Sequence, residues 1–269
     1  MAFQPQTALF KAKSPGRSQG PNTGLFLALT GHALHVTPAY MHSIVRGALI
    51  ELNGDGTGPW VEQWLSPQRF HTYMLLAGGD RTRALDLHEW NTQLNAGLLH
   101  DFAHLEVGLR NFYDRALMNA VQPGEAHWTD PASFTALFPA VTGNDARTHA
   151  DLASARTKAG GPSAPPGKIL AELTFGFWVL LTSSRHTTLL WTPHLEALYP
   201  AGSQRRKIHN GLDDMRKARN RVAHHEPVRV SDVNNLIRRM RRYAGYVSAD
   251  LGRYIRQTST VDALLHSRP

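Results

Sequence analysis

Three side chains near the end of one predicted helix could together act on a phosphate group. They are Arg219, Asn220 and His224, within the segment KARNRVAHHEP at 217–227. Asn220 and His224 are four residues apart, which places them on one face of a helix, a turn from each other. Arg219 is next to Asn220 and can lean toward the same opening. The spacing therefore predicts that three polar side chains able to bind a phosphate meet at this helix end.

Arg219 also breaks the apolar pattern of its own helix. The stripe of the helix predicted over 205–226 consists of Ile208, Leu212, Met215 and Val222. Arg219 falls on this stripe, where an apolar residue is expected. Because burying an unpaired charge is costly, the guanidinium must find a partner or face a cleft. A basic helix end that interacts with the helix dipole would explain the histidines but not this arginine.

Helices are the elements that the apolar periodicity predicts along the chain. The clearest is 89–120, whose apolar residues recur every three or four positions: Trp90, Leu94, Leu98, Phe102, Leu105, Leu109, Phe112 and Ala116. Further helices are predicted over 39–52, and over 66–79 with Ser66 as N-cap and Gly78-Gly79 as the C-terminal stop. Others are predicted from Asp80 toward 89, from Asp130, over 169–183, over 205–226, and over 232–257 with Ser231 as N-cap. No run alternates as a strand would. The predicted fold class is all-α, an antiparallel bundle whose core is formed by helices near 89–120, 169–183, 205–225 and 232–257.

The chain divides into three predicted regions. Residues 1–58 are rich in helix breakers, as in SPGRSQGPNTG and NGDGTG, which predicts a partly disordered N-terminal extension. Residues 59–257 carry the predicted helical domain, and residues 258–269 are predicted to be a C-terminal tail. Within the domain, residues 121–168 are predicted to be a mixed connection, and KAGGPSAPPGK at 158–168 an exposed linker.

The positive charge lies in the C-terminal quarter of the chain. The net charge is +8, and residues 203–269 hold 15 Lys and Arg against 6 Asp and Glu, whereas residues 1–202 hold 14 against 15. Such a patch favours a polyanion, with binding that weakens steeply as salt rises. A solvated surface is the commoner explanation for basic helices in general.

Composition also restricts the chemistry and the compartment. The chain has no cysteine, which excludes disulfides and thiolate chemistry and fits a reducing cytoplasm. Its longest apolar runs, such as FGFWVLL at 175–181, are too short to span a bilayer and suit a buried helix. We therefore expect a cytoplasmic protein that does not associate with membranes.

The active-site signature of the HEPN superfamily resembles RNRVAHHEP at 219–227. In that signature an arginine and a polar residue, often asparagine, precede a histidine, with four to six positions between the arginine and the histidine; here four residues separate Arg219 from His224. The flanking HHEP is similar to the Abi-like branch, the abortive-infection proteins of the AbiD and AbiF types. The resemblance covers about residues 60–255 in family order, through WLSPQRFHTYMLLAGGDRTRALDLHEWN (64–91), LEVGLRNFYDRAL (105–117), LTFGFWVLL (173–181) and LYP (198–200).

The resemblance implies a HEPN-type bundle with additional N-terminal helices, and a homodimer with a composite active site. It implies an endoribonuclease that needs neither a metal nor another cofactor. His224 would be the general base or acid, acting on the ribose 2′-hydroxyl or the leaving 5′ oxygen. Arg219 would stabilise the charge that develops on phosphorus, and Asn220 would orient the phosphate or the histidine. DNA, which lacks the 2′-hydroxyl, should resist, and RNA should yield a 2′,3′-cyclic phosphate and a 5′-hydroxyl.

Five further residues match the Abi-like pattern and are candidate accessory residues: His225, Glu226, Glu106, Arg110 and Asn111. His225 points about 100° away from His224 on a helix, so a structural role is an open alternative. Glu106 and Arg110 are four residues apart, and an ordinary salt bridge between them is as good an explanation.

The resemblance also suggests a biological setting. We expect a toxin that cuts cellular RNA in phage defence or in a toxin–antitoxin system, with an antitoxin as a second partner. One alternative is a non-catalytic HEPN module that binds RNA or a protein without turnover. Another is a scaffold whose helix only dimerises and which has no affinity for RNA.

Overall fold

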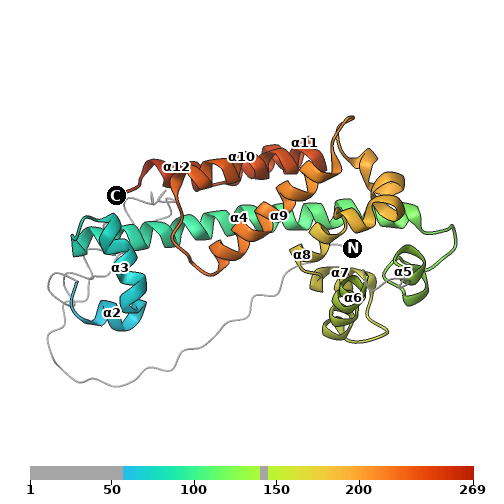
Figure 1. Ribbon diagram of the computed structural model, residues 1–269, viewed down its shortest axis with the longest axis horizontal. Coiled ribbons are helices and arrows are strands. Elements are labelled where there is room, and N and C mark those ends of the chain that lie inside the picture. The colour runs from blue at the N-terminus through green and yellow to red at the C-terminus, as the bar shows by residue number, and fades with distance from the viewer. Residues whose placement is uncertain (1–56, 140–144) are drawn as a thin grey trace, which may run out of the picture. The chain divides into compact units, whose positions relative to one another are not determined.

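Every regular element in the described part of the chain is a helix. The computed structural model describes residues 57–139 and 145–269, and no strand occurs among them (Figure 1). The all-α class predicted from the periodicity is confirmed. The helix predicted over 39–52 and nearly all of the extension predicted over 1–58 lie outside the described residues.

The helices follow one another along the chain with short connections. The α-helices are α2 (Trp60–Leu65), α3 (Pro67–Leu76), α4 (Arg81–Ala120), α5 (Pro131–Leu137), α6 (Ala146–Ala159), α7 (Pro166–Glu172), α8 (Phe175–Leu180), α9 (Arg205–Ala223), α10 (Val230–Val247), α11 (Ala249–Thr258) and α12 (Val261–His266). Between α8 and α9 lie two 3-10 helices, η1 (Ser184–His186) and η3 (Glu196–Leu198), and one π-helix, η2 (Thr187–Leu195).

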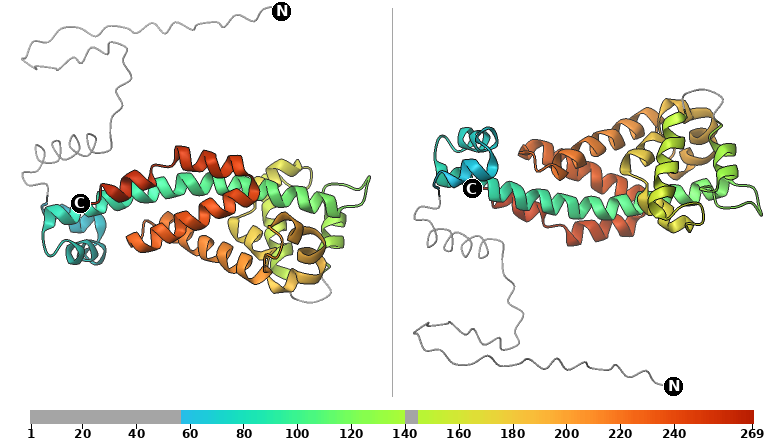
Figure 2. Two further views of the ribbon diagram at one scale, coloured as in Figure 1. Left: turned by 90° about the horizontal axis from the view of Figure 1, so that it is seen from above. Right: turned by 90° about the horizontal axis from the view of Figure 1, so that it is seen from below.

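The long helix α4 organises the bundle. It begins after Asp80, whose carboxylate accepts the backbone N–H of Arg83 at 3.0 Å, as an N-cap residue does. Its buried side contains the apolar stripe predicted over 89–120. Helices α8, α9, α10, α11 and α12 all contact it, and Figures 1 and 2 show α10 to α12 running alongside it. One helix therefore supports both the core and the candidate site.

The last helices run antiparallel to α4. Early in α4, the indole Nε1 of Trp90 donates to the carbonyl of Leu264 in α12 at 2.7 Å. Later in α4, Gly108 lies against Leu251 of α11. The contacts thus follow opposite chain order. The buried apolar residues of α4 from Trp90 onward belong to one core cluster with those of α8, α9, α10 and α11. This arrangement agrees with the predicted antiparallel bundle.

Helices α9 and α10 approach each other closely at Gly211. The hydroxyl of Tyr243 in α10 donates to the carbonyl of Ile208 in α9 at 2.8 Å. A Cβ atom added at Gly211 would overlap that hydroxyl and crowd the ring behind it. Both Gly211 and Tyr243 are buried. The missing side chain at position 211 therefore lets the tyrosine pack directly on the backbone of α9.

We expect Gly211→Ala to lower the free energy of unfolding by about 1–3 kcal/mol, because it overpacks a closed helix contact. The sign of the change in the free energy of unfolding is informative. At an unconstrained helix position alanine would stabilise the protein by about 1 kcal/mol relative to glycine. Adding Tyr243→Phe should recover part of the loss by removing the atom that overlaps most. Urea unfolding of the parent, both single variants and the double variant measures this. A Gly211→Ala protein at least as stable as the parent contradicts it.

Helices α2 and α3 form a second apolar cluster with the start of α4. Its buried members are Val61, Leu65, Phe70, Tyr73, Ala77, Ala84 and Leu87. The predicted start of α3 is confirmed, because the Ser66 hydroxyl accepts the backbone N–H of Arg69. The predicted stop is confirmed as well, because Gly78 and Gly79 follow the last turn with positive φ. Two N-terminal helices thus precede the main bundle in the described chain.

Two helices that the sequence predicts as continuous are broken. The one predicted over 169–183 divides into α7 and α8, with Leu173 and Thr174 extended at ψ 126° and 161°. The one predicted over 232–257 divides into α10 and α11 at Ser248, which is extended at φ −164° and ψ 150°. The Ser248 hydroxyl accepts the N–H of Leu251 and so caps α11. Apolar periodicity missed this break because the stripe resumes beyond it.

Three smaller predictions are corrected. Helix α10 begins at Val230, with Arg229 at the N-cap position, so Ser231 is inside the helix. Residues 258–269, predicted as a tail, include α12, which buries Val261 and Leu264. Helix α6 lies in the predicted mixed connection and buries few apolar residues, which left it without a clear stripe. No helix in the described ranges is long and apolar enough to cross a membrane.

Candidate active site

Arg219 is held beside the core by a carboxylate of another helix. The predicted stripe of α9 is buried, with exposed fractions of 5 % or less for Ile208, Leu212, Met215 and Val222. The Arg219 side chain turns to α4, where its Nε donates to Oε1 of Glu106 at 2.9 Å. The Arg219 side chain remains 38 % exposed and that of Glu106 25 % exposed. The predicted requirement for a partner or a cleft is met by a partner at a partly open position.

The open side of this pair is a hollow lined by residues of α4, α6, α7, α8 and α9. Its cavity volume is about 460 Å³. Arg219 and Asn220 of α9 line it together with Glu106, and Arg216, one turn earlier on α9, lines it as well. Arg147 of α6 contributes a further cation from across the hollow. Of the predicted site residues, the structure thus brings together Arg219, Asn220 and Glu106.

The pair with Glu106 leaves most of the Arg219 guanidinium available. Within the described residues Arg219 makes this one side-chain hydrogen bond, through Nε, so its terminal amino groups are not engaged. Asn220 is exposed, and its side chain bonds to no other described residue. A fixed guanidinium with unused donors next to a free amide is an arrangement that can bind a phosphate in two places.

The other α4 candidates are only partly brought to this hollow. The predicted alternative, a salt bridge between Glu106 and Arg110, is wrong, because Glu106 pairs with Arg219 instead. Arg110 lines an adjoining pocket of about 230 Å³ with Glu106, Phe175 and Trp178. Asn111 is exposed on α4 and lines neither cavity.

His224 lies beyond the hollow, at the end of α9. It is the C-cap residue, its backbone N–H donates to the carbonyl of Asn220 at 3.0 Å, and its side chain is exposed. The predicted one-turn relation of His224 to Asn220 is therefore present. However, His224 does not line the hollow that Arg219 and Asn220 share. Three side chains were predicted to meet in one opening. Within one chain only Arg219 and Asn220 do so.

His225 and Glu226 end the helix through backbone geometry. His225 is left-handed at φ 54°, and its N–H donates to the carbonyl of Val222 at 3.0 Å. The Glu226 N–H donates to the carbonyl of Arg221 at 3.1 Å, and the Glu226 carboxylate accepts a hydrogen bond from Arg221 Nε at 3.0 Å. These two backbone bonds form a Schellman motif, which satisfies the last carbonyls of α9. The helix thus stops before Pro227, and His225 has the structural role left open above.

Two buried asparagines of α4 hold the segment after α9 in place. The side-chain amides of Asn91 and Asn95 both donate to the carbonyl of Glu226, each at 3.4 Å. Asn91 Oδ1 also accepts the backbone N–H of Val228 at 3.0 Å. Their exposed fractions are 2 % and 0 %. The position of His224 relative to α4 therefore depends on these amides, which sequence reasoning missed although they lie four residues apart in the clearest helix.

We expect His225→Gly to raise the free energy of unfolding by roughly 0.5–1 kcal/mol. The left-handed conformation costs an L-residue about 1–2 kcal/mol, and the greater freedom of glycine in the unfolded chain offsets part of the gain. His225→Ala keeps the strain and serves as the matched control. Thermal unfolding of the three proteins measures the difference. No gain for glycine over alanine contradicts the proposed strain.

Arg69 and His88 lie close to the end of α9. Arg69 Nη2 of α3 donates to the carbonyl of His224 at 3.4 Å. Burial lowers the pKa of His88, Glu89 opposes this shift, and Arg69 and His225 nearby lower the pKa further. Burial first, and the neighbouring basic side chains second, therefore favour a neutral imidazole at His88.

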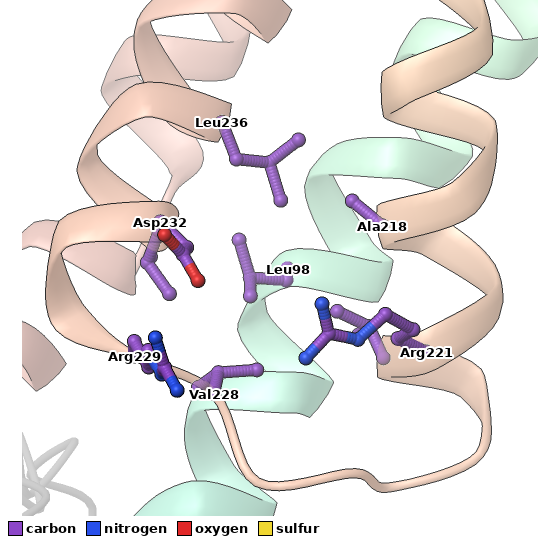
Figure 3. Close-up of a pocket in the computed structure, with 9 residues that line it drawn as sticks. Leu98, Ala218, Arg221, Val228, Arg229, Asp232 and Leu236 are labelled. Carbon is purple, nitrogen blue, oxygen red and sulfur yellow. The ribbon is translucent and has the colours of Figure 1, made fainter.

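The other side of α9 carries a small apolar cavity. Its volume is about 60 Å³, and Leu98 of α4, Ala218 of α9 and Leu236 of α10 line it (Figure 3). Figure 3 also shows Arg221 and Arg229 at its edge. A space of this size holds a few water molecules at most, so it offers no room for a nucleotide.

Comparison with known protein families, with curated proteins and with solved structures found no match to this chain. The HEPN resemblance therefore remains a prediction carried by the motifs within residues 60–255.

Proposed function

We propose that the protein is a metal-independent endoribonuclease of the HEPN type. The observation that carries the proposal is the position of Arg219, which Glu106 fixes at the edge of a hollow while its terminal donors stay free. A preorganised cation of this kind stabilises charge that develops in a transition state without rearranging during the reaction. Asn220 lies in the same hollow, and His224 follows one turn later on α9.

The proposed reaction uses the ribose 2′-hydroxyl as the nucleophile. The His224 imidazole takes the hydroxyl proton, and the 2′ oxygen forms a bond to phosphorus. The bond from phosphorus to the 5′ oxygen then breaks, and a protonated imidazole returns a proton to that oxygen. Arg219 stabilises the added negative charge on the phosphoryl oxygens. The products are a 2′,3′-cyclic phosphate and a 5′-hydroxyl, and no redox step or metal is required.

The proposal includes a homodimer. His224 of one chain lies outside the hollow that its own Arg219 lines. Both side chains are nevertheless accessible at the same end of α9, so a second copy of that helix could present its His224 to the first hollow. A homodimer also supplies the two imidazoles that an acid and a base require. In the biological setting proposed from the resemblance, such an enzyme would be a toxin with an antitoxin as its partner.

One observation favours a second candidate, a non-catalytic module that binds RNA. The separation of His224 from the hollow means that a single chain can bind a phosphate through Arg219 and Asn220 without an imidazole beside it. This candidate predicts tight, salt-sensitive binding of RNA that remains intact.

Incubation of the purified protein with cellular RNA distinguishes the two. The proposed enzyme degrades RNA, and Arg219→Ala and His224→Ala do not, whereas Arg253→Ala, a change to an exposed arginine of α11, degrades it at the parent rate. RNA that binds but stays intact with the parent protein supports the module. Equal degradation by all four proteins rejects the site.

A further inference from the structure

Two more arginines that the proposed reaction does not use line the hollow beside Arg219, together with the exposed Glu172 of α7. Arg147 comes from α6 and Arg216 from α9, and both side chains lie near Gly176 in the first turn of α8. A Cβ atom built at Gly176 would lie 3.7 Å from Cδ of Arg216 and 4.0 Å from Nη2 of Arg147. Two arginine side chains from distant parts of the sequence are therefore within reach of one small group bound in the hollow beside Gly176.

Both arginines are anchored locally but keep donors available. Arg216 contacts Asp213 through Nε at 2.9 Å and through Nη2 at 2.8 Å, so its remaining amino group is unengaged within the described chain. Burial would raise the pKa of Asp213, but hydrogen bonds from Lys217 and Arg216 outweigh it and lower the pKa. Arg147 is 69 % exposed and makes only a loose contact with Asp151, at 3.7 Å. Arg216 is thus preset, and Arg147 can close over a ligand.

Arg216 continues the line of predicted site residues along α9. Arg216, Asn220 and His224 are spaced by four residues, so they follow one face of the helix and its end. Four residues correspond to a rise of about 6 Å, which is on the order of one nucleotide step along an extended single strand. A strand whose reacting phosphate lies at Arg219 and Asn220 would therefore bring a neighbouring phosphate to Arg216.

We propose that Arg147 and Arg216 form a second phosphate subsite, which binds the phosphate next to the one that is cut in a single-stranded RNA. This inference rests on the proposed function for the name of the ligand, and it adds positioning residues to it. The subsite would fix which stretch of an extended strand enters the hollow.

The test measures binding of an oligonucleotide that cannot be cut. A short single-stranded RNA with every 2′-hydroxyl methylated is titrated with the full chain at several salt concentrations. Arg147→Gln and Arg216→Gln should each weaken binding roughly 3–10-fold and reduce the slope of log affinity against log salt by about 0.7, the value for one phosphate contact on a single strand. Arg253→Gln is the matched control, because Arg253 is 61 % exposed, has a local aspartate partner and carries the same charge.

Substitution of Gly176 provides an independent test of the same subsite. Gly176→Asp places a carboxylate between the two arginines, at a helix first turn where aspartate is well tolerated. It should weaken binding about tenfold or more at low salt, since the carboxylate occupies both cations. Gly176→Ala meets only ordinary contacts, at 3.5 Å or more, and adds no charge, so it should change affinity less than about twofold. Circular dichroism of each variant verifies folding, and the exposed Arg147 provides a variant that does not perturb the core.

The outcomes separate this inference from the proposed function. The subsite is supported if Arg147→Gln, Arg216→Gln and Gly176→Asp weaken binding while the controls Arg253→Gln and Gly176→Ala do not. This result supports it even if unmodified RNA is never cut. Binding by these variants that equals binding by Arg253→Gln overturns the subsite, even if unmodified RNA is cut by the parent protein. Failure of the parent protein to bind the oligonucleotide also overturns it.

Discussion

Replacement of Arg219 by alanine is expected to lower the rate of RNA cleavage by about 10²–10³-fold, the loss typical when a donor to a developing charge is removed. The fold should tolerate the change. The pair with Glu106 is partly exposed on both sides, and such pairs contribute about 1 kcal/mol or less to stability. Single-turnover cleavage of a labelled RNA, with a thermal unfolding curve for each protein, measures both effects.

Arg219→Lys is the informative companion to that variant. Lysine keeps the positive charge but lacks the planar fork that can bond to Glu106 and to a phosphate at once. It should recover only part of the lost rate. Full activity in the lysine variant would show that charge alone matters, and full activity in the alanine variant would remove Arg219 from the mechanism.

Replacement of His224 by alanine is expected to lower the cleavage rate by about 10²–10⁴-fold, the usual contribution of general acid–base catalysis. His224 is exposed at the end of α9, so its removal should leave stability nearly unchanged. The same exposure makes chemical rescue feasible, because free imidazole can diffuse to the vacated position. Added imidazole should raise the rate of His224→Ala and leave the rate of Arg219→Ala unchanged.

His225→Ala provides the matched control for His224. The two histidines are adjacent and both exposed, but His225 sits at the left-handed position that ends α9. Its replacement should leave cleavage within about twofold of the parent rate, a small effect compared with loss of a general acid or base. Equal losses for both histidines, or no rescue of His224→Ala, would indicate that the helix end has a structural role only.

The apolar periodicity predicted the main helices because it follows directly from burial on one side. The stripe from Trp90 to Ala116 is buried in α4, and the caps at Ser66 and Asp80 form as their residue types predict. The break at Ser248 was missed, because apolar residues on both sides of it keep nearly the same phase. A single serine hydroxyl that caps α11 decides the backbone there, and periodicity contains no information about it.

The candidate site was predicted in part for a similar reason. Arg219 could be singled out because it interrupts a stripe, and its need for a partner followed from its charge. Which partner it finds depends on the packing of α9 on α4, and that packing selects Glu106 over other carboxylates. Arg147 could not be found from the sequence, because α6 was not predicted and only the fold brings it to Gly176. Local patterns therefore identify residues that violate a rule, and tertiary structure identifies their neighbours.

Attack by the ribose 2′-hydroxyl is tested by cleavage of one RNA in two forms. A single preferred cleavage position is first mapped in an RNA oligonucleotide, and the oligonucleotide is then made with a 2′-deoxyribose at that one position. We expect the unmodified form to yield a 2′,3′-cyclic phosphate and a 5′-hydroxyl, identified by mass spectrometry, and the modified form to remain uncut at that position. Cleavage of the modified form at the same position and rate, or products that carry a 5′-phosphate, would contradict this mechanism.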